Sequence, residues 1–260
     1  MDSGTHDAAV GRMNLLVDFL CRVGWGMALG LVLTPAADVP GGFFRANLLV
    51  VMGAATFAAL GLFPEEVVLS GGGLAWLLPA AAALVAWVGG ILWLAGRRGG
   101  GIVACLLCAK LLAMVVALRG GASGGIGGAV GGLVSGAVVG LTLHAMLLGH
   151  WYLNAPGMRV DVLRRMIDIA LLAWGLECLL AVPGALELIG GWSGSRAPDR
   201  ATLALTALRW VGGLVGLPVL LVMSRQTLAI PNTQSATGIL YVACLAAITG
   251  DLAARLLAAG

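Results

Sequence analysis

Eight long apolar runs, separated by short segments rich in glycine, proline and arginine, cover most of this 260-residue sequence. A helix needs about 20 mostly apolar residues to cross the ~30 Å of hydrocarbon in a bilayer. The runs have that length, whereas the strands of a membrane β-barrel are alternating segments of about ten residues. They are residues 14–34, 44–63, 73–96, 102–119, 126–153, 163–190, 202–224 and 236–257. We therefore predict an all-α, polytopic integral membrane protein with eight transmembrane helices.

The amino-acid composition excludes the soluble, disordered and nucleic-acid-binding classes. Apolar residues make up 60% of the chain and charged residues only 10%, against about 45–50% and about 25% in soluble domains. A chain so apolar is not disordered either. The net charge is only +3 and the basic residues are spread along the sequence, so we expect no nucleic-acid partner. The expected surroundings are the lipid bilayer of the inner (cytoplasmic) membrane, with other subunits of a membrane complex as partners.

The arginines of the connecting segments predict an orientation. Seven arginines lie in or beside the connections 35–43, 97–101, 154–162 and 225–235, and five lie on the side of the termini. Because basic residues favour the cytoplasmic side, both termini are expected on the non-cytoplasmic side. Residues 1–13 are expected to form a polar N-terminal tail and not a signal peptide, because a long apolar run and several further spans follow them.

Four landmarks recur in the same order in the two halves of the sequence. The pairs are Met27–Gly30 with Met146–Gly149, Pro64–Gly72 with Pro183–Gly191, Trp87–Gly90 with Trp210–Gly213, and Gly101–Leu106 with Gly238–Leu245. The first two pairs lie 119 residues apart and the third lies 123 residues apart. Halves of four spans each cross the membrane in the same direction, which makes a parallel repeat. We predict a 4+4 parallel repeat with units 14–119 and 126–260.

A stripe of glycines follows one side of the predicted fifth span. Its members, spaced by four residues, are Gly124, Gly128, Gly132, Gly136 and Gly140. Small residues at this spacing let the backbone of a neighbouring helix approach closely. We expect this glycine stripe to face another helix at short range.

Several ionisable side chains fall within the predicted spans. Charges in hydrocarbon are costly, and they usually pair or line a cavity. The candidates for an intramembrane charge or proton relay are Lys110, Asp168, Glu177 and Arg209. A bridge between Lys110 and Glu177 is the simplest structural alternative.

Two further pairs of opposite charge lie four residues apart within single predicted spans. They are Asp18 with Arg22 and Asp251 with Arg255. Residues at this spacing share one helix face, so each pair is expected to neutralise itself locally or to extend its charged groups to the membrane interface.

Polar and aromatic residues gather at two segments that the eight-span topology places at the same membrane face. One segment ends the fifth span and the other begins the eighth. The candidates for binding a quinone or lipid head group are His144, His150, Trp151, Tyr152, Gln234, Ser235 and Tyr241. We expect a pocket open to lipid or to a partner subunit, with Arg209 or Glu177 deeper inside, bordered by the candidates other than His144. The alternatives are an aromatic belt at the membrane interface and simple capping of a helix.

Metal and haem sites are not expected. His144 and His150 are six residues apart, which places them about 120° apart around a helix, and no HExxH spacing occurs. The third histidine, His6, lies in the expected tail, so a haem with axial histidines from two helices is excluded and one held by a single histidine is not favoured. Cys105 and Cys108 lack two further zinc ligands. We expect no metal and no covalently bound cofactor, with quinone as the candidate ligand.

Three functions stay open at this stage. The first is an integral membrane subunit of a redox or respiratory complex that interacts with quinone and anchors partner subunits, because the loops are too short for independent catalysis. In helix count and two-part plan the chain resembles the quinone-reactive membrane subunits of polysulfide-reductase-like oxidoreductases, a likeness of architecture that covers no motif. His150 or His144 would then hydrogen-bond a quinone carbonyl, with Glu177 or Asp168 as the onward relay. The alternatives are a small transporter or channel and a purely structural or assembly subunit.

Overall fold

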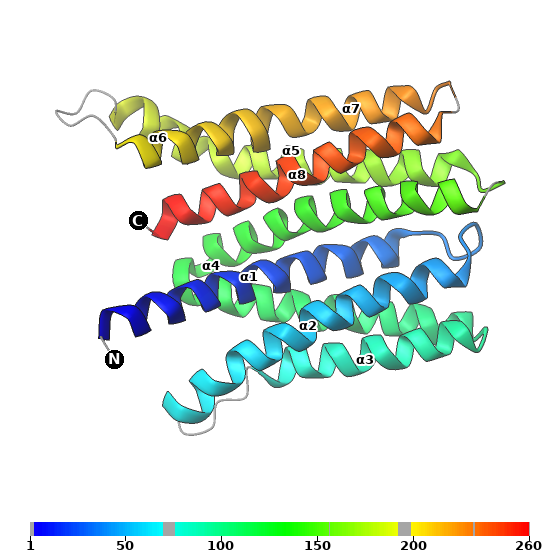
Figure 1. The fold of residues 1–260 in the computed structure, drawn as a ribbon, viewed down its shortest axis with the longest axis horizontal. Helices are drawn as coiled ribbons and strands as arrows, with labels where there is room; N and C mark the ends of the chain where they lie inside the picture. Colours follow the sequence, from blue (N-terminus) through cyan, green and yellow to red (C-terminus); the bar gives the residue numbers. More distant parts are fainter. Residues whose placement is uncertain (1–2, 70–75, 156, 192–198, 231, 260) are drawn as a thin grey trace. The chain divides into compact units, whose positions relative to one another are not determined.

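The chain is all-helical, as the sequence predicts. The computed structural model describes residues 3–69, 76–155, 157–191, 199–230 and 232–259, and in these ranges every regular element is a helix. The elements are α1 (Ser3–Leu33), α2 (Gly41–Leu69), α3 (Leu77–Leu94), α4 (Arg98–Asn154), α5 (Val160–Gly191), α6 (Arg200–Ala207), η1 (Leu208–Gly216), α7 (Leu217–Thr227) and α8 (Thr233–Ala259) (Figure 1).

Within the described residues, seven helical segments are long and apolar enough to cross a membrane. Helices α1, α2, α3, α4, α5 and α8 provide one segment each, and the contiguous α6, η1 and α7 provide the seventh, Arg200–Thr227. The segment in α4 has 57 residues, about 85 Å of helix against ~30 Å of hydrocarbon. The chain therefore has the helices of a multi-pass membrane protein. Helix α1 begins at Ser3 and so takes in most of the expected N-terminal tail.

The chain forms two compact units, residues 1–144 (unit 1) and residues 145–260 (unit 2). Their boundary falls inside helix α4 and therefore inside the predicted fifth span. The repeat units 14–119 and 126–260 stay a prediction.

Helix α4 is bent sharply at Gly124 and Gly125, whose backbone angles are not helical. Gly125 has a φ of +59°, a conformation that glycine adopts without steric cost. On either side of the bend, the Cβ of a side chain at Gly120 would lie 2.5 Å from the carbonyl oxygen of Gly128. A Cβ at Gly132 would lie 3.2 Å from Val116. The two parts of α4 therefore run back along each other, as Figure 1 shows.

Unit 1 packs α1, α2 and α3 with the first part of α4. Helix α2 contacts both α1 and α3. One cluster of its core consists of Val17, Cys21, Ala58, Leu62, Val115 and Val116. Because these side chains come from three helices, their burial stabilises the unit as a bundle.

Helix α8 packs against η1 and α7 in unit 2. A Cβ at Gly213 of η1 would lie 2.9 Å from the Cα of Gly250 in α8, so the two backbones touch where neither residue has a side chain. Helix α5 is held to η1 by the indole N–H of Trp174, which donates to the carbonyl oxygen of Leu214 at 3.1 Å. These two contacts position η1 between α5 and α8.

The π-helical form of η1 has a cause in the sequence. In an α-helix the carbonyl of Leu214 would accept from the amide of residue 218, but Pro218 has no N–H and its ring clashes with that carbonyl. The helix widens just before this proline, and Trp174 supplies the missing donor. At the start of the same segment, Asp199 caps α6 by accepting from the amide of Thr202 at 3.2 Å. Hydrogen bonds from Thr202, first from its side chain and then from its backbone, hold the pKa of the Asp199 carboxyl below its usual value.

Candidate functional site

The candidate head-group residues divide between the two units. His144 belongs to unit 1, and the other six candidates belong to unit 2. Within unit 2, helix α4 ends and helix α8 begins in the same region, so residues more than 80 positions apart in the sequence lie side by side there.

His150 and Tyr241 form the contact between these two helices. The Tyr241 hydroxyl lies 3.2 Å from Nδ1 of His150. Gly149 and Thr237 explain the approach, because a Cβ at Gly149 would lie 2.7 Å from the Thr237 hydroxyl. Both His150 and Tyr241 are exposed, and the tyrosine keeps 46% of its surface accessible. The pair therefore lies on the outer surface of unit 2, where an imidazole and a phenol are both accessible.

Gln234 and Ser235 lie at the start of α8 and are both exposed. The amide of Ser235 donates to Oδ1 of Asn232 at 3.0 Å, which is the geometry of an N-terminal helix cap. Gln234 is seven residues, or about two turns, before Tyr241 and shares its side of the helix. Of these two residues, Gln234 extends the surface around the His150–Tyr241 pair, and Ser235 takes part in capping.

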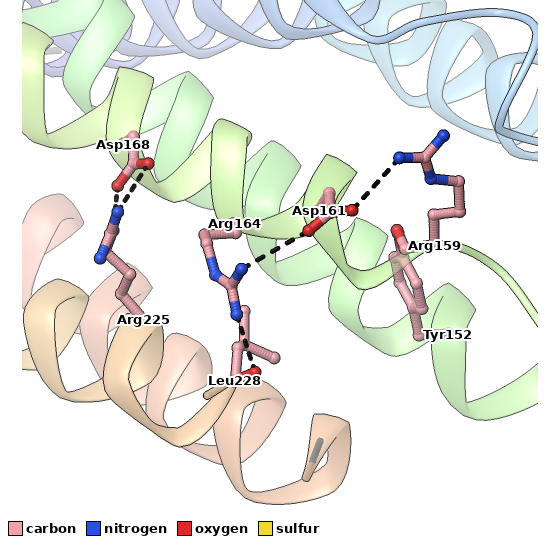
Figure 2. A network of polar contacts seen from close by, with 7 residues as sticks. All are labelled: Tyr152, Arg159, Asp161, Arg164, Asp168, Arg225 and Leu228. Carbon is pink, nitrogen blue, oxygen red and sulfur yellow. Dashed lines mark hydrogen bonds and ion pairs between the residues drawn. The ribbon is translucent and has the colours of Figure 1, made fainter. Parts of the chain in front are cut away.

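Tyr152 has a different surrounding. It is 6% exposed, and its hydroxyl donates to the carbonyl oxygen of Arg159 in the turn between α4 and α5 (Figure 2). Trp151 beside it is half-buried. Tyr152 therefore fixes the turn and is not presented to a ligand beside His150.

A polar network ties the start of α5 to the end of α7 at this same end of unit 2 (Figure 2). Arg225 forms a two-contact ion pair with Asp168. Arg164 donates to the carbonyl oxygen of Leu228 at 3.0 Å and lies 3.5 Å from Asp161. The relay candidate Asp168 is therefore engaged by a fixed cation.

His144 lies in the interior of unit 1. Its Nε2 is 2.7 Å from the hydroxyl oxygen of Thr34, and that hydroxyl also lies 2.8 Å from the carbonyl oxygen of Gly30. The Phe43 ring meets the imidazole edge to face with centroids 5.3 Å apart. A Cβ at Gly30 would lie 2.5 Å from His144 Cγ, so the missing side chain makes the space for the imidazole. His144 has no accessible surface and is a packed polar residue of the core.

The glycine stripe lies against α1 and the first part of α4. A Cβ at Gly136 would lie 2.9 Å from the Trp25 ring and 3.0 Å from the Arg22 carbonyl oxygen. A Cβ at Gly140 would overlap the backbone of Gly26. Gly128 and Gly132 face Gly120 and Val116, as described above. Gly124 has nothing within 4 Å, since it lies at the bend of α4.

The two pairs expected within single helices differ in outcome. Asp251 and Arg255 form a two-contact ion pair at 2.8 and 2.9 Å. Asp18 instead forms an ion pair with Arg119 of α4, and Arg22 donates to Ser135 at 3.3 Å. The expectation of an Asp18–Arg22 pair was wrong, because spacing within a helix cannot show a closer cation on a neighbouring helix.

The relay candidates belong to different units. Lys110 lies on the exposed side of the first part of α4 in unit 1. Glu177 of α5 lies in unit 2, where Asp251 of α8 and Arg209 of η1 are the charges within electrostatic reach of it. Among the residues that the structure describes, no group of three His, Cys, Asp or Glu side chains is arranged to hold a metal ion.

Three features of the site were not singled out in the sequence. Thr34 is the hydrogen-bond partner of His144, Arg119 is the partner of Asp18, and Trp174 satisfies Leu214. Only the last leaves a signal in the sequence, since a proline in the interior of a helix removes the amide donor of the carbonyl four residues earlier.

The helices and these polar groups define a multi-pass α-helical membrane protein. No protein-family model, curated protein or solved structure matches the chain.

Proposed function

We propose that this chain is an integral membrane subunit of a redox complex and that unit 2 holds the head group of a quinone or quinol at the His150–Tyr241 pair. One observation carries the proposal. Two side chains that both donate and accept hydrogen bonds are joined at 3.2 Å, and both are exposed, His150 in the last turns of α4 and Tyr241 in the first third of α8.

The chemistry of the pair suits a quinone. A quinone presents two carbonyl oxygens, which accept hydrogen bonds, and its reduction to a quinol takes up two electrons and two protons. With Nδ1 of His150 joined to Tyr241, Nε2 is the imidazole nitrogen available to a carbonyl of the ligand. Imidazole is a common donor and acceptor of protons in such steps. The electrons come from a redox-active partner subunit, and this chain supplies binding and proton exchange.

An exposed lysine supports the proposed partner subunits. Lys110 is exposed among the exposed apolar residues Leu106, Leu107 and Met114 of α4. An ammonium group at this position in hydrocarbon is costly unless an opposite charge meets it. An acidic residue on a helix of a partner subunit would satisfy it.

We further propose that α4 crosses the membrane twice, which gives eight spans in a 4+4 parallel arrangement. The bend at Gly124 and Gly125 and the contact between Gly120 and Gly128 support two crossings. The helix boundaries support the repeat, since α2 and α5 begin 119 residues apart and α3 and α6 begin 123 residues apart. These are the offsets of the sequence landmarks.

The arginine network of Figure 2 supports the proposed orientation in the inner membrane. Arg159, Arg164 and Arg225 gather at the end of unit 2 that carries the His150–Tyr241 pair. Basic residues favour the cytoplasmic side, so the head group would lie near the cytoplasm and both termini outside.

Photoaffinity labelling tests the head-group site. The full chain in nanodiscs is irradiated with an azidoquinone, and the labelled peptides are identified by mass spectrometry. We expect label at the end of α4 and the start of α8, with a loss of about tenfold in His150→Leu and a smaller loss in Tyr241→Phe. Gln226→Leu is the matched control, because Gln226 is an exposed polar residue at the end of α7 and should leave labelling unchanged.

Two results would overturn the proposal. Labelling that is equal in the parent, His150→Leu and Tyr241→Phe would leave a structural or assembly subunit as the function. Label that excess phospholipid removes and excess unlabelled quinone does not would show a lipid head-group site without a redox role.

A further inference from the structure

A second polar region of unit 2 lies towards the other ends of its helices. Glu177 is in the second half of α5, Arg209 is in the first half of the segment formed by α6, η1 and α7, and Asp251 is in the second half of α8. The middle segment runs opposite to α5 and α8 in Figure 1, so the three charges lie on the same side of the middle of the unit. The His150–Tyr241 pair lies on the other side.

Two helix contacts bring these charges together, one between two backbones and one between a side chain and a backbone. Gly213 of η1 touches Gly250 of α8, which places Arg209, one turn before Gly213, near Asp251. Trp174 holds α5 to Leu214 of η1, and Glu177 lies one turn after Trp174. The position of the charges therefore follows from packing around η1, and π-helical segments are frequent at functional sites.

The charges differ in how they are satisfied. Asp251 and Arg255 neutralise each other through two hydrogen bonds of 2.8 and 2.9 Å. In the part of the chain that the structure describes, Glu177 has no hydrogen bond and no ion pair, and Arg209 contacts only the Trp210 ring, at 6.0 Å. Arg209 attracts and Asp251 repels a negative charge on Glu177. The carboxyl of Glu177 is therefore the group of this set whose charge is least fixed by a partner.

We propose that Glu177 is an intramembrane proton-binding site at which unit 2 takes up and releases one proton, with Arg209 as its fixed counter-charge. The step is a simple protonation, in which the carboxylate gains a proton to become a neutral carboxyl and no electron moves. The site does not depend on the quinone proposal, because it uses other residues at the other end of the unit. A group of this kind serves a proton pathway or a proton-coupled transporter.

Labelling with dicyclohexylcarbodiimide tests the site, since this apolar reagent reacts with protonated carboxyl groups inside membranes. The full chain in nanodiscs is treated over a range of pH, and adducts are mapped by mass spectrometry. We expect one adduct, on Glu177, with a rate that falls about tenfold for each pH unit above the titration of the group. Glu177→Gln should abolish the adduct, and Glu177→Asp should retain it.

The control is Asp168→Asn, which alters a carboxylate of the same helix that is paired with Arg225 and should leave the adduct unchanged. His150→Leu should also leave it unchanged, which separates this proposal from the quinone site. An adduct on Asp168 or Asp251 of the parent chain, or a yield independent of pH, would overturn the proposal without any variant. Protection by sodium at constant pH would overturn it too, by showing a metal-cation site.

Discussion

His144 and His150 lie six residues apart in one helix and have opposite surroundings. His144 is fully buried against Thr34 and Phe43, whereas His150 is exposed beside Tyr241. Their angular separation of about 120° follows from the sequence. The sequence does not show which of the two histidines points into the core, because the space for His144 is left by Gly30 on a neighbouring helix.

The contact between Thr34 and His144 should be measurable as stability. Thr34→Val keeps the shape of the side chain and removes the hydroxyl, which leaves His144 Nε2 buried without its partner. We expect the free energy of unfolding to fall by about 1–3 kcal/mol, and a lower midpoint in thermal unfolding in detergent would show it. Thr34→Ser keeps the hydroxyl and should lose less. Equal loss in both variants would assign the effect to packing.

Ion pairs show what residue spacing can and cannot predict. The pair of Asp251 with Arg255 forms along one helix, as expected. Asp18 has a cation at the same spacing but pairs with Arg119 from a helix about 100 positions away in the sequence. Local pairs are predictable only where no other helix brings a better partner, and the sequence alone does not show which helices touch.

At the scale of the helix, the glycine stripe predicts a sharp contrast between neighbouring positions. Gly136→Leu would place its side chain against Arg22 and Trp25 and should cost about 1–3 kcal/mol or prevent folding by overpacking. Gly131→Leu in the same helix has nothing within 4 Å of its Cβ and should leave stability unchanged or raise it, since leucine favours helix more than glycine does. Yield and unfolding midpoint of the purified variants measure the difference. Equal behaviour would mean that the stripe is not a packing surface.

Trp174 and Pro218 should be coupled energetically because both determine which donor reaches the Leu214 carbonyl oxygen. Trp174→Phe removes the donor to the Leu214 carbonyl oxygen and should cost about 1–3 kcal/mol. Pro218→Ala restores an amide that this carbonyl can use, so Trp174→Phe should cost less in that background. A double-mutant cycle on unfolding free energies measures the coupling. A coupling of zero would contradict the explanation given for η1.

The helices themselves were largely predictable, because hydrophobic length is decided locally. The expected runs 44–63, 163–190 and 236–257 fall within α2, α5 and α8. The expected runs 102–119 and 126–153 both fall within α4, since glycines at 124 and 125 make the turn without any polar loop that would end the helix. The widening of η1 was not anticipated, because it arises from Pro218 together with a donor on another helix.

At the scale of the whole molecule, the number of crossings decides which connections share a side of the membrane. If α4 crosses twice, Ser123→Cys should react with an impermeant maleimide from the side opposite to Gly99→Cys and Asn154→Cys. All three positions are exposed, whereas four of the five natural cysteines are buried. Labelling of intact and inverted vesicles measures the side. Reaction of all three from one side would show that α4 does not cross twice.

The bend in α4 has a consequence for biogenesis. Between Arg119 and Arg159 the chain contains no Asp, Glu, Lys or Arg, so the second arm of α4 leaves the ribosome without a charge of its own to direct it. Insertion machinery reads flanking basic residues to orient a helix, and the nearest such signals on the C-terminal side are Arg159, Arg164 and Arg165 of the next segment. If α4 crosses the membrane twice, the orientation of its second part would therefore depend on Arg119 before it and on the arginines of the following segment, and not on any charge within it.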